Sequence, residues 1–547
     1  MISLSAEQKS LLKLFTQREQ YIIPDFQRPY SWELDQCRKL YDDFIEAYNN
    51  QNDYFLGNII VAVGLKEEDK PNVVDGQQRL ISIWLMFRAL SLILPNMKVL
   101  EEALSTLNWD GSEKQIKIKS EVIEAYDWQD LKFVSEWSLE DIEREYQKCS
   151  DRYGEFSYPN NLKRIEANCL YFYDSFKHFL STDGSEALIS FVRFILKDVS
   201  LLPIILSDVD IENAKNKALT IFETINDRGL DLADADIFKA RLFVKAINES
   251  QKNEFKTLWT DLKRACKGLC IEIDDAFRYY SHILRGIADN TKNEISLREF
   301  FTSANSPISS KDYKQIMKDL LLITDLLSEY KKRKNEPTEL AAWLQLVDAY
   351  TNAYPKYAVI TYLYHYGFYN VDELISNLKS IVRYCYFKGS TTYVKFEIYN
   401  MIQSLSHVSA LKTYYQPNIQ GSDFDYLGRL KYAYALLATY LEDKHHTLQN
   451  YDYDRLLTSR DYSTLASDWS NHDLENHIDD LGNLVVIDNY RRSRPYTDKQ
   501  KAYCKTKIQE LKSFLEDNPD SISFKNLKRR TEHKKSLLVS FFKGKIL

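Results

Sequence analysis

The 547-residue chain is too long for a single hydrophobic core, so we expect two or three domains. Its composition is 44% hydrophobic and 28% charged, with only 15 Gly and 12 Pro, which excludes disordered and linker-rich proteins. The most apolar stretch, residues 81–95, contains Arg88 and is too short to span a bilayer, and the N-terminal segment lacks the pattern of a signal peptide. We therefore expect a soluble, cytoplasmic protein with no membrane segment.

The seven cysteines are scattered and odd in number, which indicates free thiols rather than a disulfide framework. The sequence has no GxSxG, HExxH or paired CxxC motif, no GxGxxG after a strand, and no Walker A loop. The enzyme classes that these motifs define therefore have little support.

Positive charge is concentrated at the C-terminal end. Residues 491–547 hold 16 Lys and Arg against 6 Asp and Glu, a local balance of +10. The whole chain carries −7, so residues 1–490 carry −17. A basic end on an acidic body indicates an anionic partner such as DNA, although a solvated helical face would give the same composition.

The first 95 residues predict a mixed α/β fold. Residues 20–23 are a short β-prone run, and residues 33–49 have helical spacing. Residues 54–63 and 72–75 read as strands, and an apolar helix is expected to begin near Gln77 and end at Pro95.

The remainder is predicted to be mainly helical. Residues 96–195 have a polar, helical pattern and are expected to form an insertion or helical cap. Residues 201–207 return to strand character, and two helices follow at about 214–225 and 232–247. Residues 250–440 are expected to be helical throughout, before a strand-like LGNLVVID segment and basic helices.

The segment VVDGQQRL, residues 73–80, joins a strand to a helix through a glycine. A helix N-terminus presents unpaired N–H groups and a positive dipole, which suit a phosphate. Arg79 in the first turn can hold a phosphate in bidentate fashion, and Gln77 and Gln78 add neutral donors. Asp75 can position a water or a metal ion, or accept from a ribose hydroxyl. An ordinary strand-to-helix turn with Asp75 as N-cap is the alternative.

Three ordered sequence blocks resemble GmrSD-type restriction proteins. The first comprises IPDFQRPYSW at 23–32 with YFLG at 54–57, and the second is DGQQR at 75–79. The third comprises IFETINDRGL at 221–230 with ADIFK at 235–239. The resemblance implies an N-terminal domain of ParB/sulfiredoxin-like fold that binds and hydrolyses a nucleoside triphosphate of unknown base with Mg²⁺ or another divalent metal.

The resemblance also assigns roles to residues. Asp75 and Arg79 are implied to act in hydrolysis. For Arg28, Arg228 and Lys239, a structural ion pair or a helix cap is the alternative to a ligand contact. The implied nucleotide-binding residues are Gln27, Arg28, Asp75, Gly76, Gln77, Gln78, Arg79, Asn226, Arg228 and Lys239.

The family commonly carries a C-terminal HNH-type nuclease domain, and LGNLVV at 481–486 resembles its middle block. Asn483 would then be a nuclease-like catalytic residue. The general-base histidine of the family falls on Arg455, which stays protonated and cannot accept the proton of the attacking water. Either the domain binds DNA without cutting it, or it cuts through a rearranged site. The expected DNA-binding residues are Arg455, Arg491, Arg492, Arg494, Lys499, Lys528, Arg529 and Arg530.

Together these observations predict an α+β, predominantly helical protein of three parts. Residues 1–250 would form the DGQQR nucleotide-binding domain with an insertion at about 96–195, residues 251–440 a helical middle domain, and residues 441–547 a small HNH-like (ββα) domain embedded in helices. The implied function is bacterial anti-phage defence, in which nucleotide turnover gates recognition or cleavage of foreign or modified DNA. The alternative is a nucleotide-sensing DNA-binding regulator or adaptor with an inactive nuclease-like domain. A partner defence protein and self-association are compatible with both.

Overall fold

The computed structural model describes residues 3–66, 68–107, 114–122, 127–152, 155–157, 162–226, 233–387, 391–443, 448, 450–470, 472–488 and 495–545. The chain divides into two compact units, Met1–Thr260 (the N-terminal unit) and Asp261–Leu547 (the C-terminal unit). Helices make up 62% of the structure and accompany a small mixed sheet, which confirms the α+β, predominantly helical class. The expected three-domain division stays a prediction.

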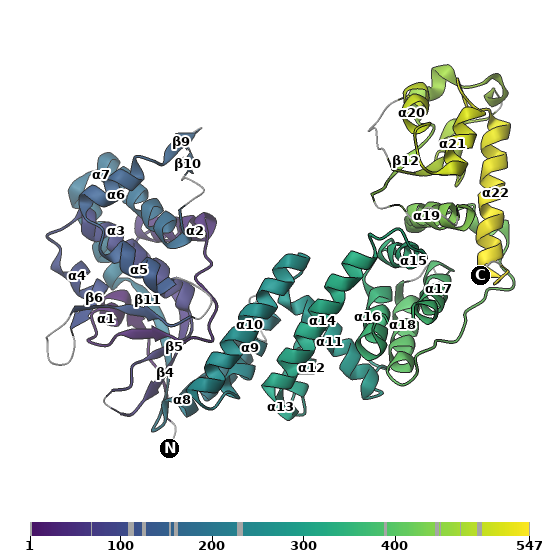
Figure 1. The fold of residues 1–547 in the computed structure, drawn as a ribbon. Coiled ribbons are helices and arrows are strands. Elements are labelled where there is room, and N and C mark those ends of the chain that lie inside the picture. The colour runs from purple at the N-terminus through teal and green to yellow at the C-terminus, as the bar shows by residue number, and fades with distance from the viewer. Residues whose placement is uncertain are drawn as a thin grey trace. The chain divides into compact units, whose positions relative to one another are not determined.

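A mixed sheet of seven strands forms the base of the N-terminal unit (Figure 1). Its order is β1-β11-β4-β5-β3-β8, and β2 pairs with β11. The central strands β11 and β4 run parallel, whereas β4 and β5 are antiparallel. The strands are β1 (Ser3–Ala6), β2 (Lys9–Ser10), β3 (Tyr21–Ile23), β4 (Tyr54–Gly64), β5 (Asn72–Asp75), β8 (Ile118–Ser120) and β11 (Val199–Asp208). The strands expected near 20–23, 54–63, 72–75 and 201–207 are all present.

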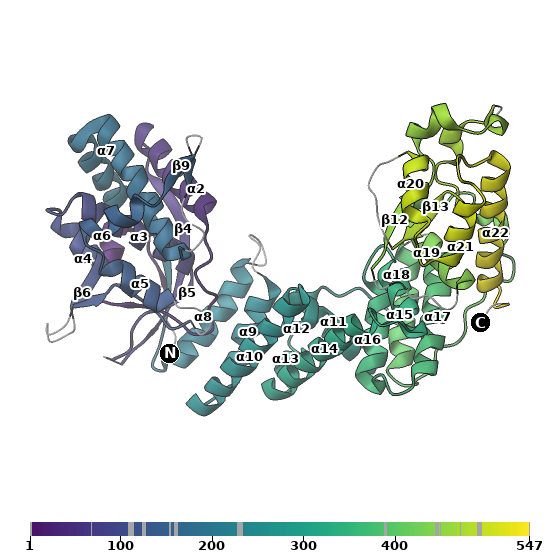
Figure 2. The same ribbon diagram turned by 45° about the horizontal axis from the view of Figure 1, so that its top comes forward.

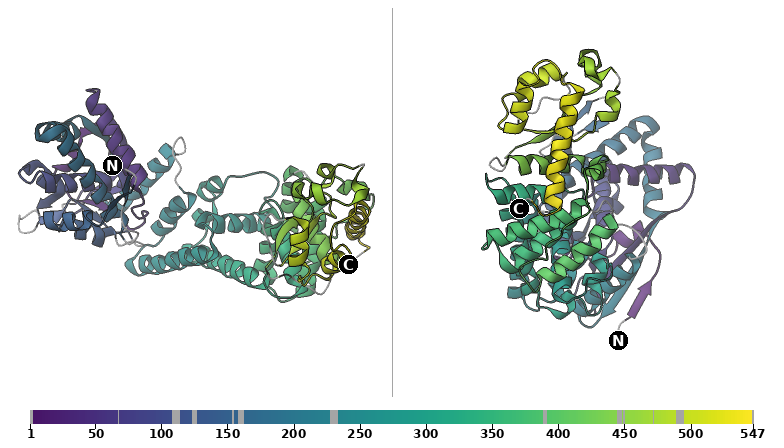
Figure 3. Two further views of the ribbon diagram at one scale, coloured as in Figure 1. Left: turned by 90° about the horizontal axis from the view of Figure 1, so that it is seen from above. Right: turned by 90° about the vertical axis from the view of Figure 1, so that its right-hand side faces the viewer.

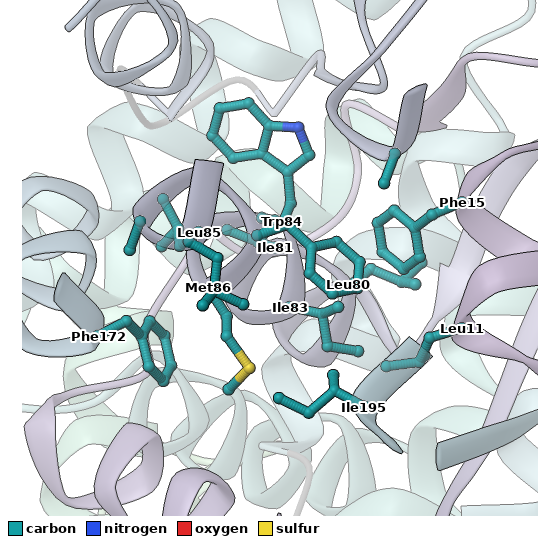
Figure 4. Close-up of a cluster of buried hydrophobic side chains, with 14 of the residues drawn as sticks. Leu11, Phe15, Leu80, Ile81, Ile83, Trp84, Leu85, Met86, Phe172 and Ile195 are labelled. Atoms are coloured by element: carbon teal, nitrogen blue, oxygen red, sulfur yellow. The ribbon is translucent and has the colours of Figure 1, made fainter. Parts of the chain in front are cut away.

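Helix α3 (Gln77–Ile93) is the centre of the hydrophobic core. Its side chains are buried on nearly every face, which is typical of a helix enclosed by other elements. It packs along α7 (Arg164–Lys197), and α1 (Leu11–Phe15) closes the same core. Figure 4 shows Trp84 and Leu80 of α3 among side chains from these neighbours. This packing fixes the first turn of α3 at the end of β5.

The other elements of the N-terminal unit surround this centre. Helix α2 packs on α7, and α8 lies along β4 and β11. The other helices are α2 (Leu34–Asn49), α4 (Lys98–Leu104), α5 (Asp127–Ser135), α6 (Leu139–Tyr146), α8 (Ile211–Asn226), α9 (Asp234–Val244) and α10 (Glu249–Leu269), of which α10 runs past the boundary between the units.

Residues 96–195, which were expected to form a helical insertion or cap, are only partly helical. Strand β8 joins the main sheet beside β3, and α7 supplies the core rather than a peripheral cap. Two short hairpins also occur: β6 (Ser105–Leu107) with β7 (Lys114–Ile116), and β9 (Ser150–Arg152) with β10 (Glu155–Ser157). Strands of three residues are too short to show an alternating pattern, so they could not be predicted from the sequence.

The C-terminal unit is largely helical, as Figures 2 and 3 show, but residues 406–430, which were also expected to be helical, contain only two short 3₁₀ turns. Its first helices are α11 (Ile273–Ile287), α12 (Leu297–Thr302), α13 (Pro307–Ser310), α14 (Tyr313–Arg333), α15 (Glu339–Asp348), α16 (Tyr354–Tyr366), α17 (Val371–Phe387), α18 (Thr391–Leu405) and α19 (Lys431–Glu442). Short 3₁₀ turns lie at Gly421–Phe424, Gly428–Leu430, Ser459–Thr464, Ser467–Trp469 and Leu474–His477.

The last part of this unit contains one antiparallel pair, β12 (Asp452–Arg455) with β13 (Leu484–Ile487). Helices α20 (Tyr496–Tyr503), α21 (Gln509–Glu516) and α22 (Phe524–Phe542) follow. No helix in the described parts of the chain is long and apolar enough to cross a membrane. All seven cysteines are free thiols, as expected.

Candidate functional site

The DGQQR segment forms a strand–glycine–helix turn. Gly76 is the N-cap of α3 and has φ of 88°. A Cβ at this position would lie 2.4 Å from Cγ2 of Ile59, so a side chain is excluded by both the backbone conformation and the available space. No side chain caps the helix, and Asp75 is not its N-cap. Apart from the Gly76 N–H, which faces the Asp75 carboxylate, the N–H groups at the start of α3 have no side-chain acceptor among the described residues.

A cavity of about 530 Å³ contains this helix start, which is within the size range of small-molecule sites. All of its walls come from the N-terminal unit: the loop before α2, the α2 helix, β4, the β5–α3 turn, α8 and α9. The residues expected to bind nucleotide that line it are Gln27, Arg28, Asp75, Gly76, Gln77, Gln78 and Arg79. Segments 50 residues apart thus meet at one site.

Three cationic side chains border the cavity. Arg79 donates from Nη1 to the carbonyl of Leu56 (3.1 Å), and its Nη2 lies 3.9 Å from the Asp75 carboxylate. Gln77 donates from Nε2 to the backbone carbonyl of Arg28 (3.1 Å), but the side chains of Arg28 and Lys39 form no hydrogen bond or ion pair with other described residues. The sequence motifs did not indicate Lys39, because it lies on α2, outside the matching blocks. A cavity with this many available donors is suited to an anion.

Gly57 provides the space that Arg79 occupies. Its φ is 113°, and a Cβ there would lie 2.4 Å from Nη1 of Arg79. The glycine of the FLG segment in β4 therefore leaves the space that the Arg79 guanidinium needs. The sequence pattern did not indicate this role.

The glutamine amides hold the loop before α2 in place. Gln77 donates from Nε2 to Oε1 of Gln27 (3.1 Å), and Gln27 donates to the carbonyl of Val74 (2.8 Å). Gln78 accepts from the backbone N–H of Ser31 (2.7 Å) and donates to the carbonyl of Pro29 (3.1 Å). Both amides were expected to face phosphates. In the structure they position the loop that carries Arg28.

The third sequence block contributes unevenly to the site. Asp236 lines the cavity from α9, whereas Lys239 is only 2% exposed and donates to the carbonyl of Gln27 (3.2 Å). Lys239 thus stabilises the loop before α2 and does not line the cavity. This agrees with the structural role that was the alternative to a ligand contact. Asn226 is the last residue of α8, and Arg228 lies outside the described residues.

Burial raises the pKa of the Asp75 carboxyl, while Arg79, the Gly76 N–H and Arg28 oppose the shift. The ionised carboxylate is therefore under-solvated and has cations on one side. Such a group is a good ligand for a divalent cation or an acceptor for a hydroxyl.

Replacing Gln78 with alanine is expected to destabilise the N-terminal unit by about 2–3 kcal/mol. The change leaves the Ser31 N–H and the Pro29 carbonyl without their partners in a half-buried loop. Thermal unfolding of the purified variant would measure the loss. Gln129→Ala, at an exposed glutamine of α5, is the matched surface control, and an equal stability of both variants would contradict this role for Gln78.

In the C-terminal unit, Arg455 ends β12 and forms a close ion pair with Asp479. Its Nη2 and Nε lie 2.6 and 3.0 Å from one carboxylate oxygen, and Lys431 approaches the same group at 3.0 Å. Although burial raises the pKa of Asp479, these two cations hold it below its ordinary value. The guanidinium is thus already occupied by a carboxylate.

Asn483 is fully buried, and its amide is satisfied by the backbone. Its Nδ2 donates to the carbonyls of Leu457 and Ile478 at 2.9 Å, and its Oδ1 accepts from the Leu457 N–H at 2.8 Å. This placement does not support the expected catalytic role, because no polar atom of the side chain remains for substrate.

Two of the expected DNA contacts are corrected to structural roles. Lys499 is fully buried, pairs with Asp454 (3.1 Å) and donates to the carbonyl of Arg455 (2.6 Å). Arg530 is 5% exposed and forms a two-pronged pair with Glu510 (2.5 and 2.9 Å). Neither can reach a phosphate at the surface.

The other expected DNA contacts differ in accessibility. Lys528 is partly exposed and lies 3.5 Å from Asp480, and Arg529 is exposed. Arg491, Arg492 and Arg494 lie outside the described residues. Among the residues that the structure describes, no group of three or more His, Cys, Asp and Glu could hold a metal ion.

The fold and the cavity define the N-terminal unit as an α/β domain whose cavity lies at a strand–glycine–helix turn. Residues 11–243 match the family described as the GmrSD restriction endonuclease, N-terminal domain. The chain therefore carries a GmrSD-type restriction domain, and the resemblance seen in the sequence is confirmed. No curated protein matches the chain. The matched residues end at 243, so the HNH-like character of residues 441–547 stays a prediction.

Proposed function

We propose that this restriction-type defence protein binds a nucleoside triphosphate in the N-terminal cavity and hydrolyses it, and that turnover gates its action on foreign or modified DNA. The observation that carries the proposal is the convergence of Arg28, Lys39 and Arg79 on the uncapped start of α3. A triphosphate carries several negative charges, which matches three cations and a positive helix end.

The cavity offers different surfaces to the two ends of a nucleotide. The start of α3 and Arg79 would hold phosphate oxygens, with Arg28 and Lys39 alongside. The apolar side chains Phe26 and Phe222 line the same cavity and would receive the base or sugar.

Asp75 is the residue that would hold a divalent metal, because its carboxylate lies beside the phosphate-binding turn. Such a metal, when bound with the nucleotide, would neutralise phosphate charge and favour attack by water. Arg79 would keep the Asp75 carboxylate ionised and at the same time contact phosphate.

DNA is the proposed target of the C-terminal unit, through exposed cations that include Lys528 and Arg529. Binding through phosphates would weaken steeply as salt rises. A second candidate function is a nucleotide-sensing regulator or adaptor that does not cut DNA. It is favoured by the Arg455–Asp479 pair and by the buried amide of Asn483, which occupy the places where nuclease chemistry was expected.

One experiment tests both candidates. Purified protein is incubated with each of the four nucleoside triphosphates, with Mg²⁺ or Mn²⁺, and without or with plain or modified DNA, while phosphate release and DNA cleavage are read together. Hydrolysis together with cleavage supports a gated nuclease. Hydrolysis without cleavage supports the regulator, and metal-dependent nicking would eliminate it. If no triphosphate binds or is hydrolysed, the proposal as a whole fails.

Replacing Asp75 with asparagine is expected to lower hydrolysis by about 10- to 100-fold and to raise stability at neutral pH. The folded-state pKa of Asp75 is raised, so folding stability falls as pH rises through the window between the ordinary and raised values. The unfavourable burial of the ionised Asp75 carboxylate persists at pH 7, and a neutral amide removes it. Phosphate release and chemical denaturation at pH 7 would measure the two effects. A variant that is both less active and less stable would contradict this account.

A further inference from the structure

A second cavity, of about 300 Å³, lies within the C-terminal unit. Its walls are formed by α11, the segment before α12, the start of α16, and α18. Helices α11, α16 and α18 pack against one another, as can be followed in Figure 1. The volume is at the lower end of the range for small-molecule sites and suits a single planar ring with a small substituent.

Aromatic rings from three helices form much of this cavity. His282 of α11 stacks close to Tyr357 of α16, with ring centroids 4.3 Å apart, and lies 5.5 Å from Tyr399 of α18. Tyr354 lies 6.0 Å from Tyr357 and 6.2 Å from Tyr399. Tyr354 and Tyr357 are half-buried, so part of each ring remains open to a ligand.

His282 places an imidazole in the wall of this cavity. It is 8% exposed, and its imidazole has no hydrogen bond with any other described residue. Burial, together with Arg285 and Arg278, lowers its pKa to about 3, so the ring is neutral at physiological pH. A neutral imidazole offers one donor and one acceptor, the pair of functions needed to read the edge of a heterocycle.

Two arginines have different roles at the cavity. Arg285 is buried, donates to the backbone carbonyls of Asn290 (3.0 Å) and Asn293, and lies over the ring of Tyr399 at 5.0 Å, so it fixes the wall. Arg278 is exposed and forms no ion pair or side-chain hydrogen bond within the described part of the chain. Its guanidinium is available for a phosphate attached to a bound ring.

We propose that this cavity is a nucleobase-binding site. The base would stack on the open parts of Tyr354 and Tyr357, exchange hydrogen bonds with His282, and place its phosphate near Arg278. Aromatic packing alone would explain the clustered rings, but not a cavity of about 300 Å³ lined by an imidazole that forms no hydrogen bond with the described residues. The base can come from a free nucleotide or from a single-stranded or flipped nucleotide of DNA. The inference does not rest on triphosphate binding by the N-terminal unit.

The test uses the full chain carrying Arg79→Ala, so that the N-terminal cavity does not contribute. The probes are the four nucleoside 5′-monophosphates, a single-stranded 12-mer DNA, and a matched 12-mer with abasic sites, with binding measured by calorimetry. The pocket variants are His282→Phe, which keeps an aromatic ring but removes the polar atoms, and Arg278→Ala, which changes an exposed side chain. Tyr369→Ala is the control, because this exposed tyrosine lies outside the cavity.

We expect each pocket variant to lose about tenfold in affinity and His282→Phe to lose discrimination among bases as well, while the control binds normally. Binding of monophosphates without competition by DNA identifies a free nucleotide as the source. Binding of base-containing but not abasic DNA identifies a DNA base. The proposal is overturned if no probe binds, if abasic DNA binds as well as normal DNA while monophosphates do not bind, or if Arg278→Ala binds like the control. Arg278→Ala remains decisive even if His282→Phe fails to fold.

Discussion

Arg79→Ala is expected to lower triphosphate affinity by at least about 100-fold, because charge-assisted hydrogen bonds are each worth about 1.5–3 kcal/mol. Arg79 lies in the first turn of α3, and its guanidinium has one fixed bond, to the carbonyl of Leu56. That bond orients the planar group, so its other donors are directed before a ligand binds. Isothermal titration with each triphosphate in the presence of Mg²⁺ would measure the loss.

Two control variants separate this effect from simple loss of charge. Arg79→Lys keeps the charge but not the planar fork, so we expect a loss of about tenfold. Arg193→Ala removes an exposed arginine of α7 and should bind normally. If Arg79→Ala binds and hydrolyses nucleotide like the wild type, the proposed role of the DGQQR turn is wrong.

Glu510→Gln is expected to destabilise the C-terminal unit by about 3–5 kcal/mol, the usual effect of removing one partner from a buried ion pair. Glu510 pairs with Arg530 at 2.5 Å and lies 3.7 Å from the ammonium of Lys534, both buried. The amide would leave the buried Arg530 without its paired carboxylate and Lys534 with only Glu442 as an anionic neighbour. Chemical denaturation followed by far-UV circular dichroism would measure the loss.

We also expect the stability that the Glu510 carboxylate contributes to depend on pH. Burial raises the pKa of Glu510, but Arg530 and Lys534 outweigh it and hold the pKa at about 2. A carboxyl group whose pKa is lowered in the folded state stabilises the fold in full above its ordinary pKa of about 4.5. This stabilisation is lost as the pH falls toward 2. The wild type should therefore lose stability across this window, and Glu510→Gln should lose much less.

Glu532→Gln provides the matched control for this prediction. Glu532 is an exposed residue of α22 that pairs with Lys535 at 3.0 Å, and Lys535 keeps a second partner in Asp425 (2.5 Å). Surface pairs contribute about 0–1 kcal/mol, so this variant should unfold almost like the wild type. Equal stabilities of the two glutamate variants would show that the buried pair does not hold α21 and α22 together.

The basic C-terminal sequence shows why charge alone did not locate a DNA surface. Arg530 and Lys534 contribute to the positive charge counted from the sequence, yet both side chains are buried against α21 and the elements around it. Their partner, Glu510, lies 20 residues from Arg530 in sequence and belongs to another helix. Burial is decided by packing partners, which a local window of sequence does not contain.

The sequence by itself determined the strand–glycine–helix turn at residues 75–79, since a β-prone run, a glycine and a helix former act locally. It also determined the helical character of most of the chain and, through ordered motif blocks, the restriction-type N-terminal domain. Only the tertiary structure showed that Lys39 lines the cavity. It also showed that the Gln77 and Gln78 amides bond to the loop before α2, and that Lys239 is buried against the carbonyl of Gln27 in the same loop. These roles depend on distances between segments far apart in the chain, which are set by packing around α3.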